Sequence, residues 1–176
     1  MIIFKKILLA FFLFLALIFV LSLFLPSEYK IVRSESYECS PDQLYSYLID
    51  INNLDSWFYI TKSLDSSMVY KFNIDSTNGK SSVEWNGELM GQGNFVFSDL
   101  QPNKTIEFKI SFQDNSVFKN GKIELLSEKS LTKVVWTDYG ENGWNPVNRI
   151  FGLFIDGFLG PDMEKSLTKL KSNIGC

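Results

Sequence analysis

The chain has 176 residues, a formal net charge of −3 and no histidine. The absence of histidine excludes the commonest general base and metal ligand, and with it every Ser-His or Cys-His nucleophilic arrangement. No cluster of lysine and arginine is present, which together with the negative charge argues against nucleic-acid binding. We therefore expect no nucleic-acid partner, no metal and no cofactor.

A long uncharged segment lies near the N-terminus. From Ile7 to Leu25, nineteen consecutive residues carry no charge, and a helix of this length reaches roughly 28 Å, close to the hydrocarbon thickness of a bilayer. A cleavable signal peptide is the alternative, but the bulky residues 23–25 stand where a small-residue cleavage site is needed. We predict a single-pass membrane anchor over residues 1–25 and one domain over residues 26–176.

The charges beside this segment bear on its orientation. Lys5 and Lys6 precede it, and Lys30 and Arg33 follow it closely, so the basic residues are balanced across it. The short basic tail is typical of a signal anchor, which places the N-terminus in the cytoplasm and the domain outside it. The domain holds all twenty acidic residues and fifteen basic ones, for a formal charge of −5.

Two cysteines, Cys39 and Cys176, have no spacing typical of a metal site. Two interpretations stay open for them. They are unrelated thiols, or they form a disulfide, which requires an oxidising compartment and a chain end near the start of the first domain helix.

After the anchor, the sequence predicts one strand and two short helices. The strand is Glu28–Glu38. Ser40-Pro41-Asp42-Gln43 predicts a helix start, since serine caps the first turn, proline suits its first position and glutamine completes a capping box. Asn52-Asn53 ends this helix, and Leu54–Tyr59 forms a second short helix or a turn.

The middle of the chain has strand patterns. Thr105–Phe112 is the clearest, because Ile106, Phe108, Ile110 and Phe112 alternate with polar residues. The other expected strand segments are Met68–Ile74, Ser81–Trp85, Glu88–Met90, Asn94–Phe97, Ser116–Leu125 and Leu131–Tyr139. Turn or bulge positions are expected at Asn78-Gly79, Asn86-Gly87 and Asn120-Gly121.

The last segment, Asn145–Lys171, has helical spacing. One face carries Val147, Phe151, Phe154 and Phe158, and the second half continues with Met163, Leu167, Leu170 and Ile174. The apolar phase slips by one residue at Gly157–Pro161, where we predict a kink or short break. Grouped strands with helices at two places predict an α+β fold, a curved antiparallel sheet of about seven strands around a long C-terminal helix. A cavity between sheet and helix is a natural outcome.

Four stretches carry a family resemblance. They are the first strand with Ser40-Pro41-Asp42-Gln43 and a helix ending near Trp57; Val83-Glu84-Trp85-Asn86-Gly87 with Gly91 and Gly93; Leu131-Thr132-Lys133-Val134-Val135-Trp136; and Asn145-Pro146-Val147-Asn148-Arg149 leading through Gly160–Leu167 to Leu170-Lys171. Together they resemble the polyketide cyclase/START-like (SRPBCC) superfamily, which has the helix-grip fold, over nearly all of the chain after the anchor. The resemblance implies an apolar pocket between sheet and last helix. It implies no single activity, because the superfamily includes carriers, cyclases, hydrolases and co-chaperone-like modules.

Large apolar side chains are the main candidates for a ligand site. The expected ligand-binding residues are Trp85, Phe95, Phe97, Phe108, Ile110, Phe112, Trp136, Phe151, Phe154 and Phe158. For any single ring a packed core is the favoured interpretation, whereas the family's cavity favours a pocket for the group. Asp138 shares its strand face with Trp136, which makes it a candidate for an inward carboxylate, although its position at the end of the strand favours the surface. Glu84 is expected on the solvated face, and Arg149 is expected to pair with an acid on the surface.

These features predict a membrane-anchored, extracytoplasmic binding module for a small apolar or amphipathic molecule, such as a lipid. One alternative is a polyketide cyclase/dehydratase-like enzyme, which without histidine would depend on Asp138, Tyr139 or Glu84. A second alternative is a non-catalytic protein-interaction domain with a filled core. The volume between sheet and helix distinguishes this last alternative from the other two.

Overall fold

The computed structural model describes residues 2–74, 81–112 and 117–176. Its elements form two compact units. One consists of the N-terminal segment up to Tyr29 together with Glu141–Gly157, and the other consists of Lys30–Gly140 together with Phe158–Cys176. Each unit therefore combines segments that are distant in the sequence.

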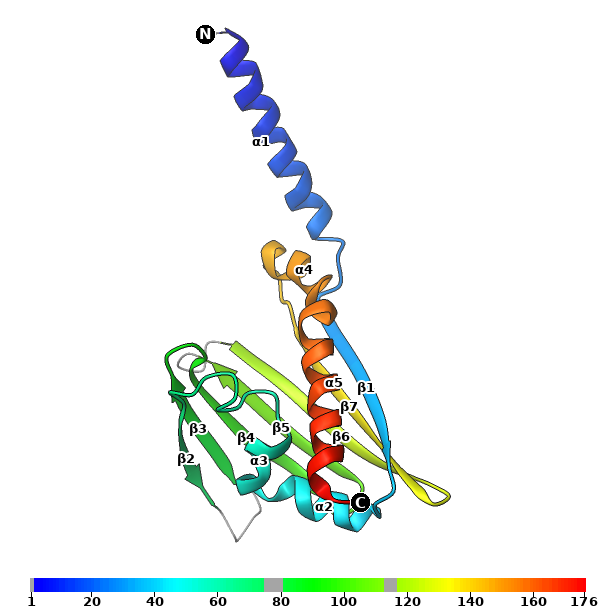
Figure 1. Ribbon diagram of the computed structural model, residues 1–176. Helices are drawn as coiled ribbons and strands as arrows, with labels where there is room; N and C mark the ends of the chain where they lie inside the picture. Colours follow the sequence, from blue (N-terminus) through cyan, green and yellow to red (C-terminus); the bar gives the residue numbers. More distant parts are fainter. Residues whose placement is uncertain (1, 75–80, 113–116) are drawn as a thin grey trace. The chain divides into compact units, whose positions relative to one another are not determined.

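The larger unit is built on a curved antiparallel sheet with seven strands, in the order β1-β7-β6-β5-β4-β3-β2 (Figure 1). The strands are β1 (Glu28–Tyr37), β2 (Val69–Asn73), β3 (Ser82–Gly87), β4 (Gly91–Gln101), β5 (Thr105–Phe112), β6 (Val117–Glu128) and β7 (Leu131–Glu141). The helices of the chain are α1 (Ile2–Ser22), α2 (Pro41–Ile49), η1 (Ile51–Asn53), α3 (Leu54–Trp57), α4 (Pro146–Gly152) and α5 (Ile155–Ile174). This order confirms the predicted α+β class, with short helices after the first strand and a long helix at the end.

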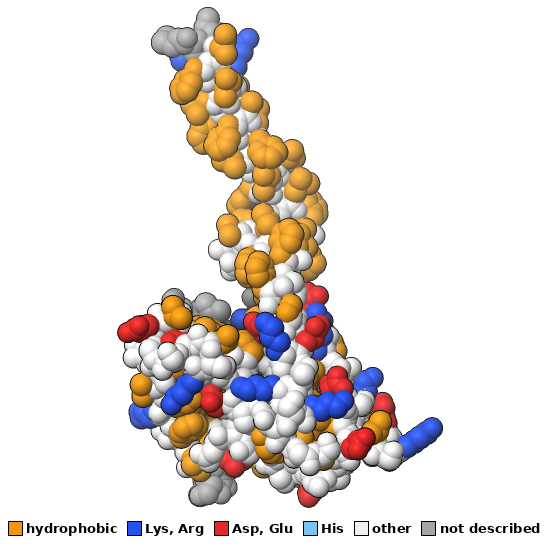
Figure 2. All heavy atoms as spheres, in the orientation of Figure 1, with side chains coloured by type: hydrophobic (Ala, Val, Ile, Leu, Met, Phe, Trp, Pro, Cys, Tyr) orange, Lys and Arg blue, Asp and Glu red, His pale blue; other side chains and the backbone are white. Residues whose placement is uncertain are grey.

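In the smaller unit, α1 is the apolar element. Residues Ile3–Ser22 form a helix long and apolar enough to cross a membrane, and apolar side chains cover it in Figure 2. Length and composition of this kind also fit a signal sequence.

The same unit contains Arg149, for which the prediction of a surface ion pair was wrong. Arg149 is buried. Its Nε donates to the carbonyl of Gly143 at 2.8 Å, and its Nη1 donates to the carbonyls of Leu23 at 2.6 Å and Leu25 at 3.3 Å. Main-chain oxygens thus replace the expected carboxylate, because the residues after α1 leave carbonyls that need donors.

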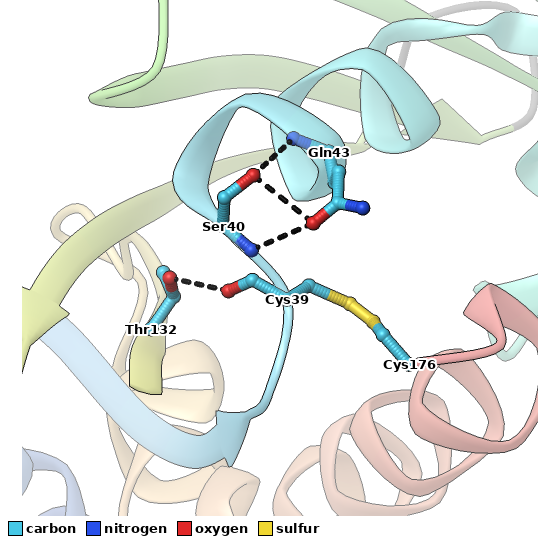
Figure 3. The surroundings of a disulfide bond; sticks show 5 residues. All are labelled: Cys39, Ser40, Gln43, Thr132 and Cys176. Carbon is cyan, nitrogen blue, oxygen red and sulfur yellow. Dashed lines mark hydrogen bonds between the residues drawn. A yellow bond between two sulfur atoms is a disulfide. The ribbon is translucent and has the colours of Figure 1, made fainter. Parts of the chain in front are cut away.

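The capping box predicted at α2 is present. The backbone N–H of Gln43 donates to Ser40 Oγ at 3.3 Å, and the N–H of Ser40 donates to Gln43 Oε1 at 2.9 Å (Figure 3). Next to the cap, Cys39 forms a disulfide with Cys176, with the two Cα atoms 5.4 Å apart. Thr132 Oγ1 on β7 donates to the carbonyl of Cys39 at 2.7 Å. Of the two interpretations left open for the cysteines, the structure contains the bonded one.

The predicted break in the last helix was placed too late. The chain leaves its helical course after Gly152, with a turn bond from Phe154 N to the carbonyl of Phe151 at 2.9 Å. Helix α5 then begins at Ile155 and continues through Pro161. A proline removes one internal hydrogen bond, and Pro161 is exposed, so the helix accommodates it.

Helix α5 runs beside β1 (Figure 1). Its buried face carries Met163, Leu167 and Leu170, as the spacing predicts. Three contacts join it to β1: Tyr37 OH donates to the carbonyl of Leu167 at 2.8 Å, Arg33 Nε pairs with Glu164 at 2.7 Å, and Lys171 Nζ pairs with Glu35 at 2.6 Å.

Strand β5 has the predicted ends, but two neighbouring predictions were wrong. Residues 88–90, expected in a strand, form the β3–β4 turn. Asp65 holds this turn, because its carboxylate accepts from Leu89 N at 2.9 Å and Met90 N at 3.0 Å. Asn120-Gly121 lies inside β6, where the ring of Phe108 leaves no space for a Cβ at Gly121. Asn78-Gly79 lies outside the described residues.

Candidate functional site

A cluster of aromatic rings fills the inner side of the sheet. Phe58, which follows α3, has its ring centroid 5.5 Å from that of Phe95, 6.4 Å from Phe108 and 5.9 Å from Trp136. Trp57 meets Trp136 edge to face at 5.8 Å. Each of these five side chains is at most 2% exposed. Side chains therefore occupy much of the inner side of the sheet. Sequence patterns do not reveal Phe58, because it lies outside the regular spacing of strand and helix.

The ten predicted site residues differ in how far they are buried. Six are buried: Trp85, Phe95, Phe97, Phe108, Ile110 and Trp136. Phe112 is half-buried, and its ring meets that of Trp85 edge to face at 5.8 Å. Phe151, Phe154 and Phe158 are exposed, so the expectation that they share a buried helix face was wrong. The short helix α4 turns Arg149 inward instead of a phenylalanine.

Three buried indole N–H groups, those of Trp57, Trp85 and Trp136, have no hydrogen-bond partner among the described residues. The side-chain oxygen of Asn94 is buried and unpartnered in the same sense. Leaving one such group without a partner costs about 1–3 kcal/mol, so each calls for a physical explanation. Two of the four, Trp85 and Asn94, border the same hollow.

This hollow lies over strands β2 to β5 and has a volume of about 640 Å³, within the usual range for small-molecule sites. It is lined by Val69, Lys71, Glu84, Trp85, Asn86, Gln92, Gly93, Asn94, Ser111 and Phe112. We call it the β2–β5 hollow. Lys71, Glu84, Asn94 and Ser111 are successive cross-strand neighbours on one face, and Trp85, Gly93 and Phe112 are neighbours on the other. The lining thus combines aromatic surface with polar groups.

Charged groups at the β2–β5 hollow form a weak ion pair. Lys71 Nζ lies 3.4 Å from Glu84 Oε2, and both side chains are largely exposed, so the pair contributes little to stability. Glu84 lies on the solvated face, as its alternation with Trp85 predicts. The pair therefore remains available for exchange with a charged or polar ligand group.

Close packing of Trp85 shapes the hollow further. A Cβ at Gly93 would collide with the indole of Trp85, so glycine at this position lets the ring lie flat on β4. At the neighbouring turn, a Cβ at Gly87 would collide with the carboxylate of Asp65. The glycines of the Trp-Asn-Gly segment and its partner strand are explained by these contacts.

Carboxylates and one lysine lie on the inner side of the sheet. Asp138 is buried on β7, as the parity with Trp136 predicts. Burial lowers the pKa of the Lys119 ammonium, while the charges of Asp138 and Asp162 act in the opposite direction. Lys119 Nζ also lies 5.5 Å from the ring centroid of Phe112. A small cavity of about 130 Å³ near Asp162 is lined by residues 58–64 and α5, and it is below the size of usual small-molecule sites.

No protein-family model and no curated protein matches the chain. Solved structures do resemble it. Protein CV1439 from Chromobacterium violaceum has a TM-score of 0.55 and 15% identity over 81% of this chain and 95% of that one. The Aha1 dimer from Colwellia psychrerythraea gives a TM-score of 0.51 and 18% identity over 81% and 91%.

A third similar structure is StfQ, described as a di-domain ARO/CYC from the steffimycin biosynthetic pathway. It has a TM-score of 0.59 and 11% identity, over 82% of this chain and 50% of StfQ. At these identities the likeness concerns the fold. The chain therefore shares the fold of these structures.

Proposed function

We propose that the chain is a membrane-tethered, extracytoplasmic module that binds a small amphipathic molecule in the β2–β5 hollow. The observation that carries this proposal is a hollow of about 640 Å³ bordered by two residues, Trp85 and Asn94, that each hold a buried polar atom without a partner among the described residues. One is a donor and the other an acceptor. Because Asn94 and Trp85 lie on opposite faces of the sheet, the ligand needs a donor for the Asn94 oxygen on one face, and an acceptor for the indole N–H with an apolar part for Trp85 and Phe112 towards the other.

The ring cluster favours the β2–β5 hollow, rather than the space between the sheet and helix α5, as the place of the ligand. START-like folds leave room for a ligand in many chemical contexts, and here Phe58 and Trp57 already fill the inner side of the sheet. The cavity of about 130 Å³ beside α5 has a fifth of the volume of the β2–β5 hollow. A lipid headgroup or a free polar metabolite with an apolar part both have the required chemistry.

The proposals of a membrane tether and of an extracytoplasmic location rest on two features. Helix α1 is long and apolar enough to span a bilayer, and Cys39 is bonded to Cys176. Disulfides persist in oxidising compartments and are rare in the cytosol, so the bond favours the outward orientation. In a bacterial host, proteinase K is expected to digest the domain in intact spheroplasts while a cytoplasmic marker stays whole. A domain that stays uncut would overturn the orientation.

The ligand proposal is tested with full-length protein purified in mild detergent. Small molecules that co-purify are identified by native mass spectrometry and by extraction after denaturation. Trp85→Phe keeps a ring but removes the indole N–H at the hollow, and Trp136→Phe makes the same change inside the ring cluster. Near-UV circular dichroism checks that both variants are folded.

We expect a molecule bound to the wild type and to Trp136→Phe, and lost from Trp85→Phe. Loss from Trp136→Phe alone would move the site to the inner side of the sheet. If no molecule accompanies any of the three proteins, and 1-anilinonaphthalene-8-sulfonate does not bind above the level seen with detergent alone, the binding proposal fails. The filled-core interaction domain would then be the better interpretation.

A cyclase/dehydratase-like enzyme is the second candidate, and one observation favours it. Asp138 is buried beside Trp136, and Lys119 lies near enough for its pKa to respond to the Asp138 charge. A buried acid or base positioned in this way is what proton transfer requires. The test is incubation with a linear poly-β-ketone, comparing cyclised and dehydrated products from the wild type and Asp138→Asn. Product formation that Asp138→Asn abolishes and Glu84→Gln preserves would support an enzyme.

A further inference from the structure

The segment between Glu141 and Asp156 carries an exposed apolar surface. Its five most exposed large side chains are Trp144 (84% exposed), Val147 (70%), Phe151 (53%), Leu153 (54%) and Phe154 (61%). We call these five residues the 144–154 cluster. All of them belong to the unit that contains α1. Exposed apolar side chains gathered in this way are typical of a surface that contacts a membrane or a partner.

Hydrogen bonds hold this segment to the residues that directly follow α1. Arg149 Nη1 donates to the carbonyls of Leu23 at 2.6 Å and Leu25 at 3.3 Å. The backbone N–H of Asn142 donates to the carbonyl of Ser27 at 2.6 Å, and its side chain donates to the carbonyl of Pro26 at 3.5 Å. The 144–154 cluster is therefore attached at the point where the chain leaves α1.

The segment offers almost no charge to water. Arg149 is the single charged residue between Glu141 and Asp156, and its guanidinium is buried and used by main-chain carbonyls. The guanidinium also lies 5.3 Å from the ring centroid of Trp144. An outward surface of tryptophan, phenylalanine and aliphatic residues, with its cation turned inward, has the composition of an interfacial membrane segment.

We propose that the 144–154 cluster lies in the interfacial layer of the same bilayer that α1 spans, as a second membrane contact. This inference rests on the tether in the proposed function. If Ile3–Ser22 crosses the bilayer, residues 23–27 emerge at its surface, and the hydrogen bonds above bring the cluster to the same depth. Continuity with the spanning helix therefore favours lipid over a protein partner as the occupant. Trp144, Phe151 and Phe154 would insert among the headgroups and upper acyl chains.

Trp144 is a natural reporter, because the other three tryptophans are at most 4% exposed. Full-length protein is reconstituted in phosphatidylcholine vesicles with and without phosphatidylcholine brominated at acyl positions 6 and 7. Because Trp144 is one of four tryptophans, bromolipid is expected to remove up to roughly a quarter of the emission. Trp144→Phe should lose most of this quenching. The double variant Phe151→Ser/Phe154→Ser should raise the accessibility of Trp144 to acrylamide, and Leu89→Ser, at an exposed leucine of the other unit, should not.

Alkaline carbonate extraction separates the two proposals. Protein that stays in the membrane pellet while Trp144 is open to acrylamide and untouched by bromolipid would overturn the cluster proposal alone. Protein released by carbonate would overturn the tether, and the cluster proposal with it. Emission shielded from acrylamide but unquenched by bromolipid would assign the cluster to a protein partner and likewise overturn the proposal.

Discussion

Removal of the Cys39–Cys176 disulfide should lower the free energy of unfolding by several kcal/mol. The bond joins residues separated by 137 positions. For a loop of this length, the loop-closure model gives about 5 kcal/mol at 25 °C, as entropy regained by the unfolded chain. Domains of ordinary size have a total stability of roughly 5–15 kcal/mol. Loss of the bond is therefore expected to remove a large part of the free energy of unfolding.

The assay is guanidinium unfolding of full-length protein in mild detergent, followed by near-UV circular dichroism from the buried tryptophans. Wild type with and without dithiothreitol is compared with Cys39→Ala/Cys176→Ala. Alanine is chosen because Cys39 is buried, where a serine hydroxyl would need a partner. Cys176→Ala alone breaks the bond with the least change in packing, because Cys176 is exposed.

Dithiothreitol should lower the transition midpoint of the wild type towards that of the double variant and leave the variant unchanged. Mass measurement after alkylation establishes that the bond was present and was then reduced. Equal midpoints for oxidised and fully reduced wild type would refute the loop-closure argument. A wild type in which both thiols alkylate without reductant would refute the bond itself, and with it the main support for an oxidising compartment.

Three further predictions concern single side chains, each measured by the same unfolding assay. Phe58→Ala should cost about 3–5 kcal/mol, because it opens a cavity among five neighbouring rings; a loss below about 1 kcal/mol would show that the ring cluster is loosely packed. Tyr37→Phe should cost about 0.5–1.5 kcal/mol, the net contribution of one hydrogen bond, since the carbonyl of Leu167 lies inside α5 and keeps its helical N–H donor. Tyr47→Phe, at a part-buried hydroxyl, should cost less. The hydrogen bond from Ser67, followed by that from Met90 N, lowers the pKa of Asp65 to about 2. The unfolded chain therefore takes up a proton first, and the free energy of unfolding should fall as pH drops from about 4 to about 2. Asp65→Asn should be less stable at neutral pH and should lose this pH dependence. An unchanged pH dependence between about pH 4 and about pH 2 would contradict the role of the carboxylate.

Local patterns predicted the parts of the fold that local interactions determine. The alternation of Thr105–Phe112 gave both ends of β5, because one face of that strand is buried and a shift by one residue would turn its apolar side chains outward. The capping box at Ser40 and Gln43 is likewise a matter of four consecutive residues. On β7, the alternation that puts Asp138 on the same face as Trp136 indicated the buried position, whereas the argument from the strand end favoured the surface and was wrong.

Other predictions failed where a distant segment decides the outcome. Periodicity shows which residues share a helix face, but not what covers that face. Phe151 and Phe154 follow the spacing of a buried face and are nevertheless exposed. The strand expected at residues 88–90 is a turn because Asp65, more than twenty positions earlier, binds its N–H groups. Phe58 packs against three of the predicted site residues, Phe95, Phe108 and Trp136, from an irregular segment that has no pattern to detect.

The four tryptophans show why one residue type can support two separate proposals. An indole has a large apolar surface and one N–H that needs an acceptor. At Trp57, Trp85 and Trp136 the apolar surface is buried and the N–H has no described partner, so the unmet requirement is polar, and Trp85 is the one that borders a hollow. At Trp144 the N–H is open to water while the ring is exposed, so the unmet requirement is apolar. A polar ligand group answers the first and a bilayer interface answers the second. Trp85→Phe should therefore abolish ligand binding, whereas Trp144→Phe keeps an apolar ring and should remove only the fluorescence signal that reports the membrane contact.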